Sequence, residues 1–243
     1  MNPSRFSLLE YLRLSRRDPR ETLPHWSHRD VLVPLSSIGP SLEQVLNAWF
    51  DRASLLRPVY TLYFSALYSE GMYLESEFLS LAQAVEIFHR SLYGDEDKYF
   101  SSSEFRRYRK AMLSPLPKRA RDLLQSKLAH ANEYSLKERL DDLSSKTPPS
   151  VKHLVVKDFD DFTTRVKDTR DHLTHYSSQK RAFTEEELFG ANRRLRLWLM
   201  ALLLSEIGIP EPVVIEALKK YKRLNFPTEL LPRNEGLSQG TDW

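Results

Sequence analysis

The sequence predicts an all-α protein, and three observations support this prediction. Only seven of the 243 residues are glycine. Over long stretches, apolar residues recur at three- and four-residue steps, the period of a helix with one buried face. Alternating runs of β-branched residues, which are typical of strands, are few. The best strand signals are VLVPL at 31–35 and HLVVKDF at 153–159, and both are weak.

The composition is that of an ordinary globular protein. The chain is 41% hydrophobic and 28% charged, enough to bury a substantial core. The absence of cysteine excludes disulfides, thiolate metal sites and cysteine nucleophiles, and it fits a reducing cytosol. Charges at Arg5, Glu10 and Arg13 interrupt any apolar region of a secretory signal. The most apolar run, 197–204, is far shorter than the roughly 18 to 20 residues that span a bilayer. We therefore expect a cytoplasmic protein with no membrane partner.

The chain is expected to divide into three parts. An N-terminal arm or linker is expected at 1–40, because four prolines from Pro19 onward prevent a long helix. They are Pro19, Pro24, Pro34 and Pro40. A helical domain is expected at 41–225, with a break at the sequence TPPS, 147–150. A loosely ordered C-terminal tail is expected at 226–243, where two prolines and two glycines occur.

The first helices of the domain are predicted by caps and apolar spacing. Ser41 and Gln44 fit a capping box that opens a helix, which Pro58 interrupts. The clearest helix is expected at 72–92, where apolar residues repeat on one face. They are Leu74, Phe78, Leu81, Val85, Phe88 and Leu92. This stripe has the pattern of a core face.

Further helices follow along the chain. Two helices are expected at 104–113 and 118–133, with prolines between them. Capping residues then predict three helix starts: Ser135 with Glu138, Asp158, and Thr184 with Glu187. The third of these helices is expected to be long and to end at Gly208. A last helix is expected from Pro210 to about Arg223.

A basic segment lies between Lys98 and Lys127, where nine basic residues face two acidic ones. Seven of the basic residues are candidate RNA-binding residues: Arg106, Arg107, Arg109, Lys110, Lys118, Arg119 and Arg121. Such a run either holds phosphate groups or forms a solvated face, and the sequence leaves both interpretations open.

The segment TRVKDTRDHLTHY, 164–176, concentrates four residues suited to RNA chemistry: Arg165, Arg170, His172 and His175. Arg170 and His175 stand at i and i+5, about 140° apart on a helix, so they converge only if the helix ends or bends there. A guanidinium binds phosphate bidentately, and an imidazole transfers protons near neutral pH. Because RNA carries its own nucleophile, the neighbouring 2′-hydroxyl, such a pair requires no metal.

The spacing alone is weak evidence. An arginine and a histidine separated by four to six residues occur three times: Arg20 with His25, Arg165 with His172, and Arg170 with His175. Periodicity alone favours a simpler interpretation of the segment, a helix end whose histidines cap carbonyl groups. In that interpretation the arginines pair with Asp161 or Asp168.

A family resemblance supports the catalytic interpretation. Three segments, in order along the chain, are similar to the HEPN region of ApeA-type bacterial proteins: 42–94, 166–176 and 195–209. The resemblance covers roughly 41–225. HEPN domains are helical bundles, commonly dimeric, and many are metal-independent endoribonucleases of toxin, abortive-infection and antiviral systems. The resemblance thus implies a HEPN-like bundle, here with additional helices.

The HEPN signature is an arginine, four to six residues, and a histidine. It falls on Arg170 and His175, with Asp171 at the usual polar position, and implies that these three are catalytic. A dimer would bring two copies of the motif together across one cleft. His172, inside the motif, either contacts RNA or packs in the core. Three residues of the helix at 72–92 either support the site or are ordinary core and edge residues: Glu86, His89 and Arg90.

The resemblance implies a metal-independent endoribonuclease of anti-phage defence that cuts cellular RNA and leaves 2′,3′-cyclic phosphate ends. The RNA is expected to be tRNA. No cofactor and no metal are expected, and the expected partners are RNA, a second copy of the chain, and a phage-derived trigger or sensing domain. The alternative is a non-catalytic helical module for dimerisation or RNA binding. A metal-dependent nuclease is the third hypothesis, although no acidic cluster has compelling ligand spacing.

Overall fold

The computed structural model describes four ranges of the chain: 31–69, 71–94, 98–176 and 181–225. Every regular element in these ranges is helical, which confirms the predicted all-α class. The helices are α2 (Leu35–Ile38), η2 (Gly39–Ser41), α3 (Leu42–Ala53), α4 (Arg57–Tyr68), α5 (Leu74–Tyr93), α6 (Ser102–Leu113), α7 (Lys118–Lys127), η3 (Leu128–His130), α8 (Leu136–Lys146), α9 (Pro149–Val155), α10 (Phe159–His175), α11 (Glu185–Glu206) and α12 (Glu211–Asn225). Of the predicted arm and tail, 1–30 and 226–243 lie outside the described residues. Within these ranges, the helices are all too short or too polar to cross a bilayer.

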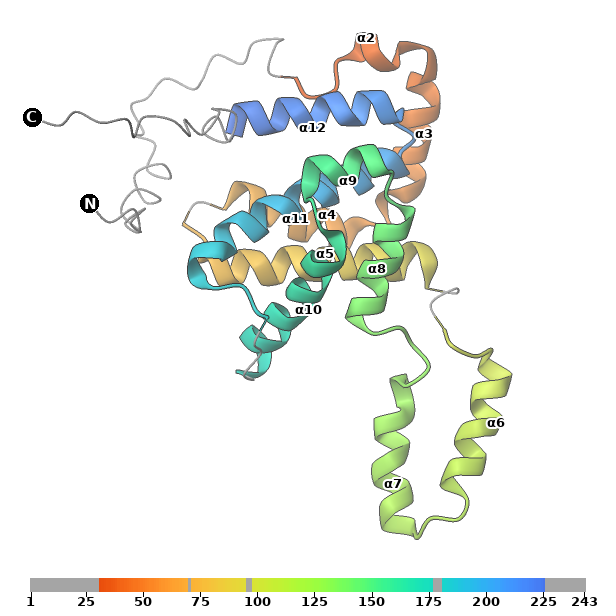
Figure 1. Ribbon diagram of the computed structural model, residues 1–243. Coiled ribbons are helices and arrows are strands. Elements are labelled where there is room, and N and C mark those ends of the chain that lie inside the picture. Colours follow the sequence, from red (N-terminus) through yellow and green to blue (C-terminus); the bar gives the residue numbers. More distant parts are fainter. Residues whose placement is uncertain (1–30, 70, 95–97, 177–180, 226–243) are drawn as a thin grey trace, which may run out of the picture.

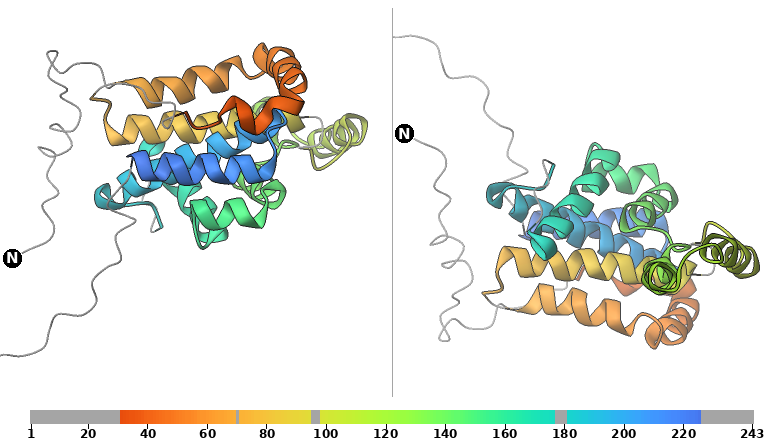
Figure 2. Two further views of the ribbon diagram at one scale, coloured as in Figure 1. Left: turned by 90° about the horizontal axis from the view of Figure 1, so that it is seen from above. Right: turned by 90° about the horizontal axis from the view of Figure 1, so that it is seen from below.

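The long helix α5 lies at the centre of the bundle. It packs against α4 on one side and α11 on the other, and α8 and α10 cross it (Figure 1, Figure 2). The predicted stripe of α5 supplies the core, where Phe78, Leu81 and Val85 are fully buried. α11 contributes Trp198 from the opposite side. The rows of apolar residues on α5 and α11 therefore meet and exclude water, which stabilises the bundle.

Trp198 links three helices at the centre. Its ring meets Phe159 of α10 edge-on, with centroids 5.1 Å apart. Its Nε1 donates a hydrogen bond of 3.0 Å to Oγ1 of Thr147, at the end of α8. A buried indole is stabilised when its N–H finds such a partner. The ring contact with Phe159 fixes α10, the helix that carries the arginine–histidine motif, on the core.

Most predicted helix starts are confirmed. The capping box at Ser135 and Glu138 opens α8, and the box at Thr184 opens α11. A further box, formed by Ser101 and Glu104, opens α6 and was not predicted. In each box the serine or threonine side chain accepts from the N3 backbone N–H, and the glutamate accepts in return. These short patterns fix helix starts because both partners are local in sequence.

The predicted capping box at Ser41 and Gln44 is wrong. Helix α3 does begin at the next residue, but the Ser41 side chain does not cap it. Its Oγ donates back to the carbonyl oxygen of Ile38 at 3.4 Å. A capping residue needs an extended backbone, whereas Ser41 ends the 3₁₀ turn η2 with φ −112° and ψ 10°. The predicted interruption near Pro58 is confirmed, because α4 begins there with proline in its first turn.

The predicted break at 147–150 contains the start of a helix. α9 begins at Pro149, directly after Pro148, and buries Val151 and Val155. Proline is tolerated in the first turn because the N–H it lacks has no helical partner there. The weak strand signal at 153–159 is not realised, since this stretch ends α9 and begins α10.

Helices α6 and α7 form a hairpin that projects from the bundle (Figure 1). Its base is closed by Asn132, whose side chain accepts from the N–H of Phe100 at 3.0 Å and donates to the Phe100 carbonyl at 2.8 Å. Leu113 is the one buried side chain of α6, and α7 has none. The helix predicted at 118–133 is shorter, with α7 ending at Lys127 before the turn η3.

Candidate functional site

The arginine–histidine motif occupies the C-terminal half of α10. The helix begins where the Asp158 side chain accepts from the backbone N–H of Asp161 at 3.0 Å. Val166 is fully buried and holds the helix on the core. The helix ends at His175, because the next residue, Tyr176, has the left-handed φ of 50°. The predicted helix end therefore coincides with the motif histidine.

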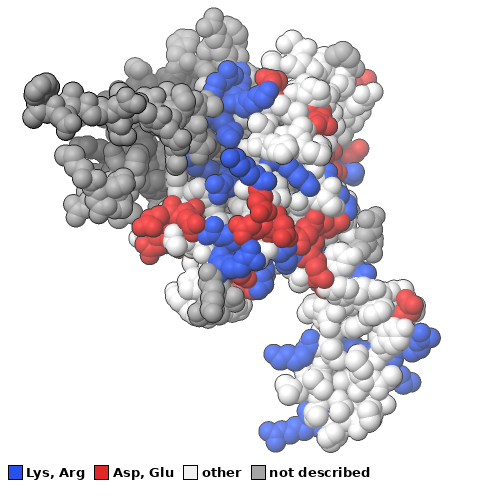
Figure 3. Space-filling view, in the orientation of Figure 1, with Lys and Arg blue, Asp and Glu red and all other residues white. Residues whose placement is uncertain are grey.

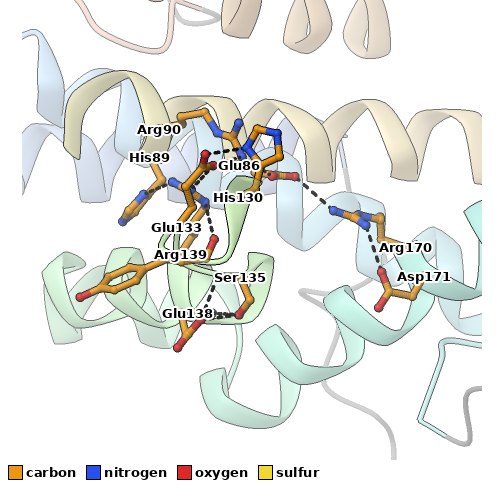
Figure 4. A network of polar contacts seen from close by, with 11 residues as sticks. Glu86, His89, Arg90, His130, Glu133, Ser135, Glu138, Arg139, Arg170 and Asp171 are labelled. Carbon is orange, nitrogen blue, oxygen red and sulfur yellow. Dashed lines mark hydrogen bonds and ion pairs between the residues drawn. The ribbon is translucent and has the colours of Figure 1, made fainter. Parts of the chain in front are cut away.

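Arg170 and His175 have different surroundings. Arg170 is half-buried, and its guanidinium donates to Asp171 at 3.1 Å and lies 3.5 Å from a carboxylate oxygen of Glu86 on α5 (Figure 4). His175 is exposed at the helix end, and His172 is half-buried. Arg170 is thus oriented from both its own helix and α5, while the imidazole of His175 is accessible to a substrate.

Arg165, which shares the arginine–histidine spacing with His172, has a structural role. Its guanidinium contacts Glu187 at 2.5 Å and donates to the carbonyl of Arg181 at 3.2 Å. It also lies 4.2 Å from the centre of the Phe183 ring. These contacts hold α10 to the start of α11. The structure therefore favours Arg170 over Arg165 as the arginine available for chemistry.

Two of the predicted supporting residues, Glu86 and Arg90, connect the motif to the base of the hairpin. They stand one turn apart on α5 and form an ion pair of 3.3 Å. Arg90 also lies 3.6 Å from Glu133, which in turn contacts His130 at 2.8 Å. A line of alternating charges thus runs from Arg170 to His130 (Figure 4).

The third supporting residue, His89, is buried. Its Nε2 is 2.8 Å from a carboxylate oxygen of Asp142, and its Nδ1 is 3.4 Å from the guanidinium of Arg139. Arg139 is only 1% exposed and donates to the backbone carbonyl of Tyr134 at 3.1 Å. These bonds fasten α8 to α5. His89 can therefore position the polar residues around it but does not reach a substrate from the surface.

Hydrogen bonding fixes the charge of this region. The contact with His130 lowers the pKa of Glu133, and the Ser135 hydroxyl lowers the pKa of Glu138. Both carboxylates are therefore ionised at neutral pH. The hydrogen bond that Tyr99 donates to Glu138 raises the pKa of Tyr99 to about 12, so its phenol stays neutral.

These side chains surround a cleft of about 560 Å³ between α5 and the base of the hairpin. It is lined by Glu86, Arg90, Tyr99, His130, Ala131, Glu133, Tyr134, Ser135 and Leu136. Sequence reasoning found Glu86 and Arg90 but missed Tyr99, His130 and Glu133. The only local signal was the pair His130 and Glu133, a histidine and an acid three residues apart in a turn.

The seven candidate RNA-binding residues all lie on the hairpin, on α6 and α7. Six of them are exposed or half-exposed: Arg106, Arg107, Arg109, Lys110, Lys118 and Arg119. Arg121 instead closes the hairpin turn, because it donates to the carbonyls of Ser114 and Leu116 at 3.3 and 3.0 Å. In Figure 3 the hairpin carries basic side chains and few acidic ones, whereas acidic and basic side chains alternate on the bundle beside it.

The chemistry of the site fits phosphate and proton transfer. Arg170 carries donors that match phosphate oxygens, and His175 places an imidazole, the commonest general acid or base, at the exposed helix end. Asp171 and Glu86 orient the guanidinium. In the described ranges, no three histidine, aspartate or glutamate side chains gather in a way that could hold a metal ion.

A helical bundle that presents an arginine, four intervening residues and a histidine at an exposed helix end has the features of a HEPN domain. The family model described as Apea-like HEPN matches residues 79–212. This match covers more than half of the chain, and the protein belongs to this family. It includes the motif, the hairpin and the cleft. No curated protein and no solved structure matches the chain. Membership in this family supports a nuclease-type function.

Proposed function

We propose that this protein is a metal-independent endoribonuclease that cuts cellular RNA, with tRNA as the expected substrate, in bacterial anti-phage defence. The observation that carries the proposal is the placement of Arg170 and His175 at the exposed end of α10 in a chain of the Apea-like HEPN family. The fold holds this pair in position. Trp198 and Val166 fix α10 on the core, while the last turn of the helix is exposed to solvent.

In the proposed reaction, the RNA supplies the nucleophile. The 2′-oxygen attacks the adjacent phosphorus, and the bond from phosphorus to the 5′-oxygen breaks. The products are a 2′,3′-cyclic phosphate and a 5′-hydroxyl. The proton lost by the 2′-hydroxyl is taken up by a base, and an acid returns one to the leaving oxygen. His175 fills one of these roles, and Arg170 binds the phosphate oxygens as negative charge develops on them.

A homodimer completes this chemistry. The reaction uses a base and an acid, and each copy presents one motif histidine, His175, at the exposed end of α10. Two copies facing each other across one cleft would supply both. A phage-derived trigger or a sensing domain would then control cutting by changing how the two motifs approach each other, in the cytoplasm where the RNA substrate lies.

A second candidate function is a non-catalytic module for dimerisation or RNA binding. One observation favours it: the guanidinium of Arg170 already contacts Asp171 at 3.1 Å and Glu86 at 3.5 Å. In this second function, the paired Arg170 joins α10 to α5 and binds no scissile phosphate. The two functions differ in the role of His175. In the nuclease it transfers protons during RNA cleavage, and in the binding module it is only part of a binding surface.

Incubating the purified protein with total RNA in EDTA tests the proposal. We expect discrete fragments with 2′,3′-cyclic phosphate ends, and a loss of about 10²- to 10⁴-fold in rate with His175→Ala, the usual contribution of a general acid or base. His153→Ala is the matched control, because His153 is exposed on α9. Cleavage that survives in His175→Ala, or that requires Mg²⁺, would contradict the mechanism. Intact RNA from a dimeric wild-type protein would favour the binding module.

A further inference from the structure

The cleft at the base of the hairpin has the composition of a nucleotide site. It is a different place from the exposed end of α10, and Glu86 links the two. Glu86 lines the cleft and also contacts Arg170. Its volume of about 560 Å³ lies within the range of small-molecule sites, roughly 300 to 1,000 Å³. Its walls combine cations, a histidine and tyrosines. The HEPN signature assigns no role to this cleft.

His130 is a highly accessible polar group of the cleft, with its side chain 82% exposed. Its Nδ1 is held 2.8 Å from Glu133, whose carboxylate stays ionised. A carboxylate on Nδ1 selects the tautomer with hydrogen on that nitrogen and orients the ring. In that neutral tautomer Nε2 is an acceptor, and in the imidazolium both ring nitrogens are donors. As the imidazolium, His130 is oriented to donate through Nε2 to an anion that enters the cleft.

Arg90 is the second candidate for anion binding. Its side chain is 53% exposed, and its carboxylate contacts measure 3.3 Å to Glu86 and 3.6 Å to Glu133. Both are longer than the roughly 2.7 to 2.9 Å of a strong charge-assisted hydrogen bond. A guanidinium held this loosely loses little when it exchanges a carboxylate oxygen for a phosphate oxygen. The two glutamates therefore hold Arg90 in place without occupying all of its N–H donors.

Tyr99 supplies a surface for a base. Its side chain is 48% exposed, its ring lies 5.4 Å from that of Tyr134, and its hydroxyl is tied to Glu138 at 2.5 Å. The ring is thereby fixed while one part of it remains open to solvent. Bases of single-stranded RNA stack on such aromatic side chains, with little dependence on sequence.

We propose that this cleft binds one nucleotide of single-stranded RNA, with His130 and Arg90 on a phosphate beside the scissile one and Tyr99 against its base. The choice of RNA as ligand rests on the proposed function. The cleft then sets where the strand lies relative to Arg170, because Glu86 contacts both Arg90 and Arg170. His130 is a binding and positioning residue, and His175 remains the residue that transfers protons.

Binding of a non-cleavable probe tests the inference. The probe is a fluorescent 2′-O-methyl oligoribonucleotide of about six nucleotides, a length typical of single-strand sites, and its 2′-oxygen cannot attack. Anisotropy in EDTA is measured for the wild-type protein, for His130→Ala and for the matched control His153→Ala, an exposed histidine outside the cleft. We expect His130→Ala to weaken binding about tenfold, as for one lost hydrogen bond to a charged group. His153→Ala should stay within about twofold of wild type.

Wild-type affinity in His130→Ala, or no binding of the probe by the wild-type protein, would overturn the inference. An abasic probe of the same length tests the role of Tyr99: we expect it to bind at least about fivefold more weakly, since a stacked base contributes at least about that factor. Equal binding of both probes would overturn the stacking contact.

Cleavage of unmodified RNA is measured separately and distinguishes the two proposals. If the probe binds through His130 and yet unmodified RNA stays intact, the proposed function fails and the nucleotide site stands. If RNA is cut through His175 while His130→Ala binds and cuts like the wild-type protein, the nuclease stands and the nucleotide site is wrong.

Discussion

The position of the motif depends on Thr169, the residue before Arg170. Thr169 is only 1% exposed, and its Oγ1 accepts a hydrogen bond of 2.8 Å from the backbone N–H of Phe183. Phe183 is itself buried. This bond ties the second half of α10 to the segment that leads into α11. Replacing Thr169 by valine keeps the shape of the side chain and removes only the hydroxyl, the acceptor of this bond.

We expect Thr169→Val to lower the free energy of unfolding by about 1 to 3 kcal/mol, the cost of leaving a buried donor without a partner. No cavity contributes, because the volume is conserved. With a urea dependence of about 1 to 3 kcal/mol per M, the unfolding midpoint should fall by roughly 1 M. Thr169→Ser retains the acceptor and should lose less.

The matched control is Thr164→Val on the same helix. Thr164 is only partly buried, and its Oγ1 donates to the carbonyl of Asp160 at 2.8 Å. That carbonyl keeps its bond within the helix, so we expect a change within about 0.5 kcal/mol. Equal urea midpoints for the two valine variants would refute the reasoning. They would mean that the N–H of Phe183 finds another partner.

Two further predictions concern the charged network. Arg139→Met removes the buried partner of His89 and of the Tyr134 carbonyl, and should lower the free energy of unfolding by about 1 to 3 kcal/mol in urea; a loss below about 1 kcal/mol would show that Arg139 is dispensable. Glu133 and Glu187 have lowered pKa values in the fold, because of hydrogen bonds from His130 and Arg165. Their contribution to the free energy of unfolding is therefore complete above about pH 4.5, the ordinary glutamate pKa. It is lost as the pH falls through the lower pKa that each has in the folded protein. Urea midpoints at pH 7 and pH 4 should differ less in Glu187→Gln than in the wild-type protein, and an unchanged difference would contradict this assignment.

Local sequence patterns predicted most of the helices and the end of α10. Each confirmed capping box needs only residues i and i+3, so the sequence contains all the information. The box at Ser41 failed because the backbone before it is already a 3₁₀ turn. The start of α9 was missed because prolines usually break a helix but are also accepted in its first turn.

The candidate site was only partly predictable. Arg170 and His175 were found because both lie in one segment, and the family resemblance selected them. The contact between Arg170 and Glu86 joins residues 84 positions apart, which no periodicity indicates. The cleft was missed for the same reason: Tyr99 and His130 meet only because the hairpin closes at Asn132.

The lengths of the ion pairs distinguish arginines that hold helices together from arginines available to a ligand. Away from the cleft, two arginines that join helices form short pairs: 2.5 Å for Arg165 with Glu187 and 2.6 Å for Arg52 with Glu206. Around the cleft, Glu86 is shared by Arg90 at 3.3 Å and Arg170 at 3.5 Å. One carboxylate cannot fully satisfy two guanidinium groups, so both retain donors for a phosphate chain. An RNA strand that bridged Arg90 and Arg170 would take up these donors in succession. On this reasoning Glu86→Gln should keep the fold but loosen both arginines. It should impair the positioning of RNA more than it lowers the stability of the protein.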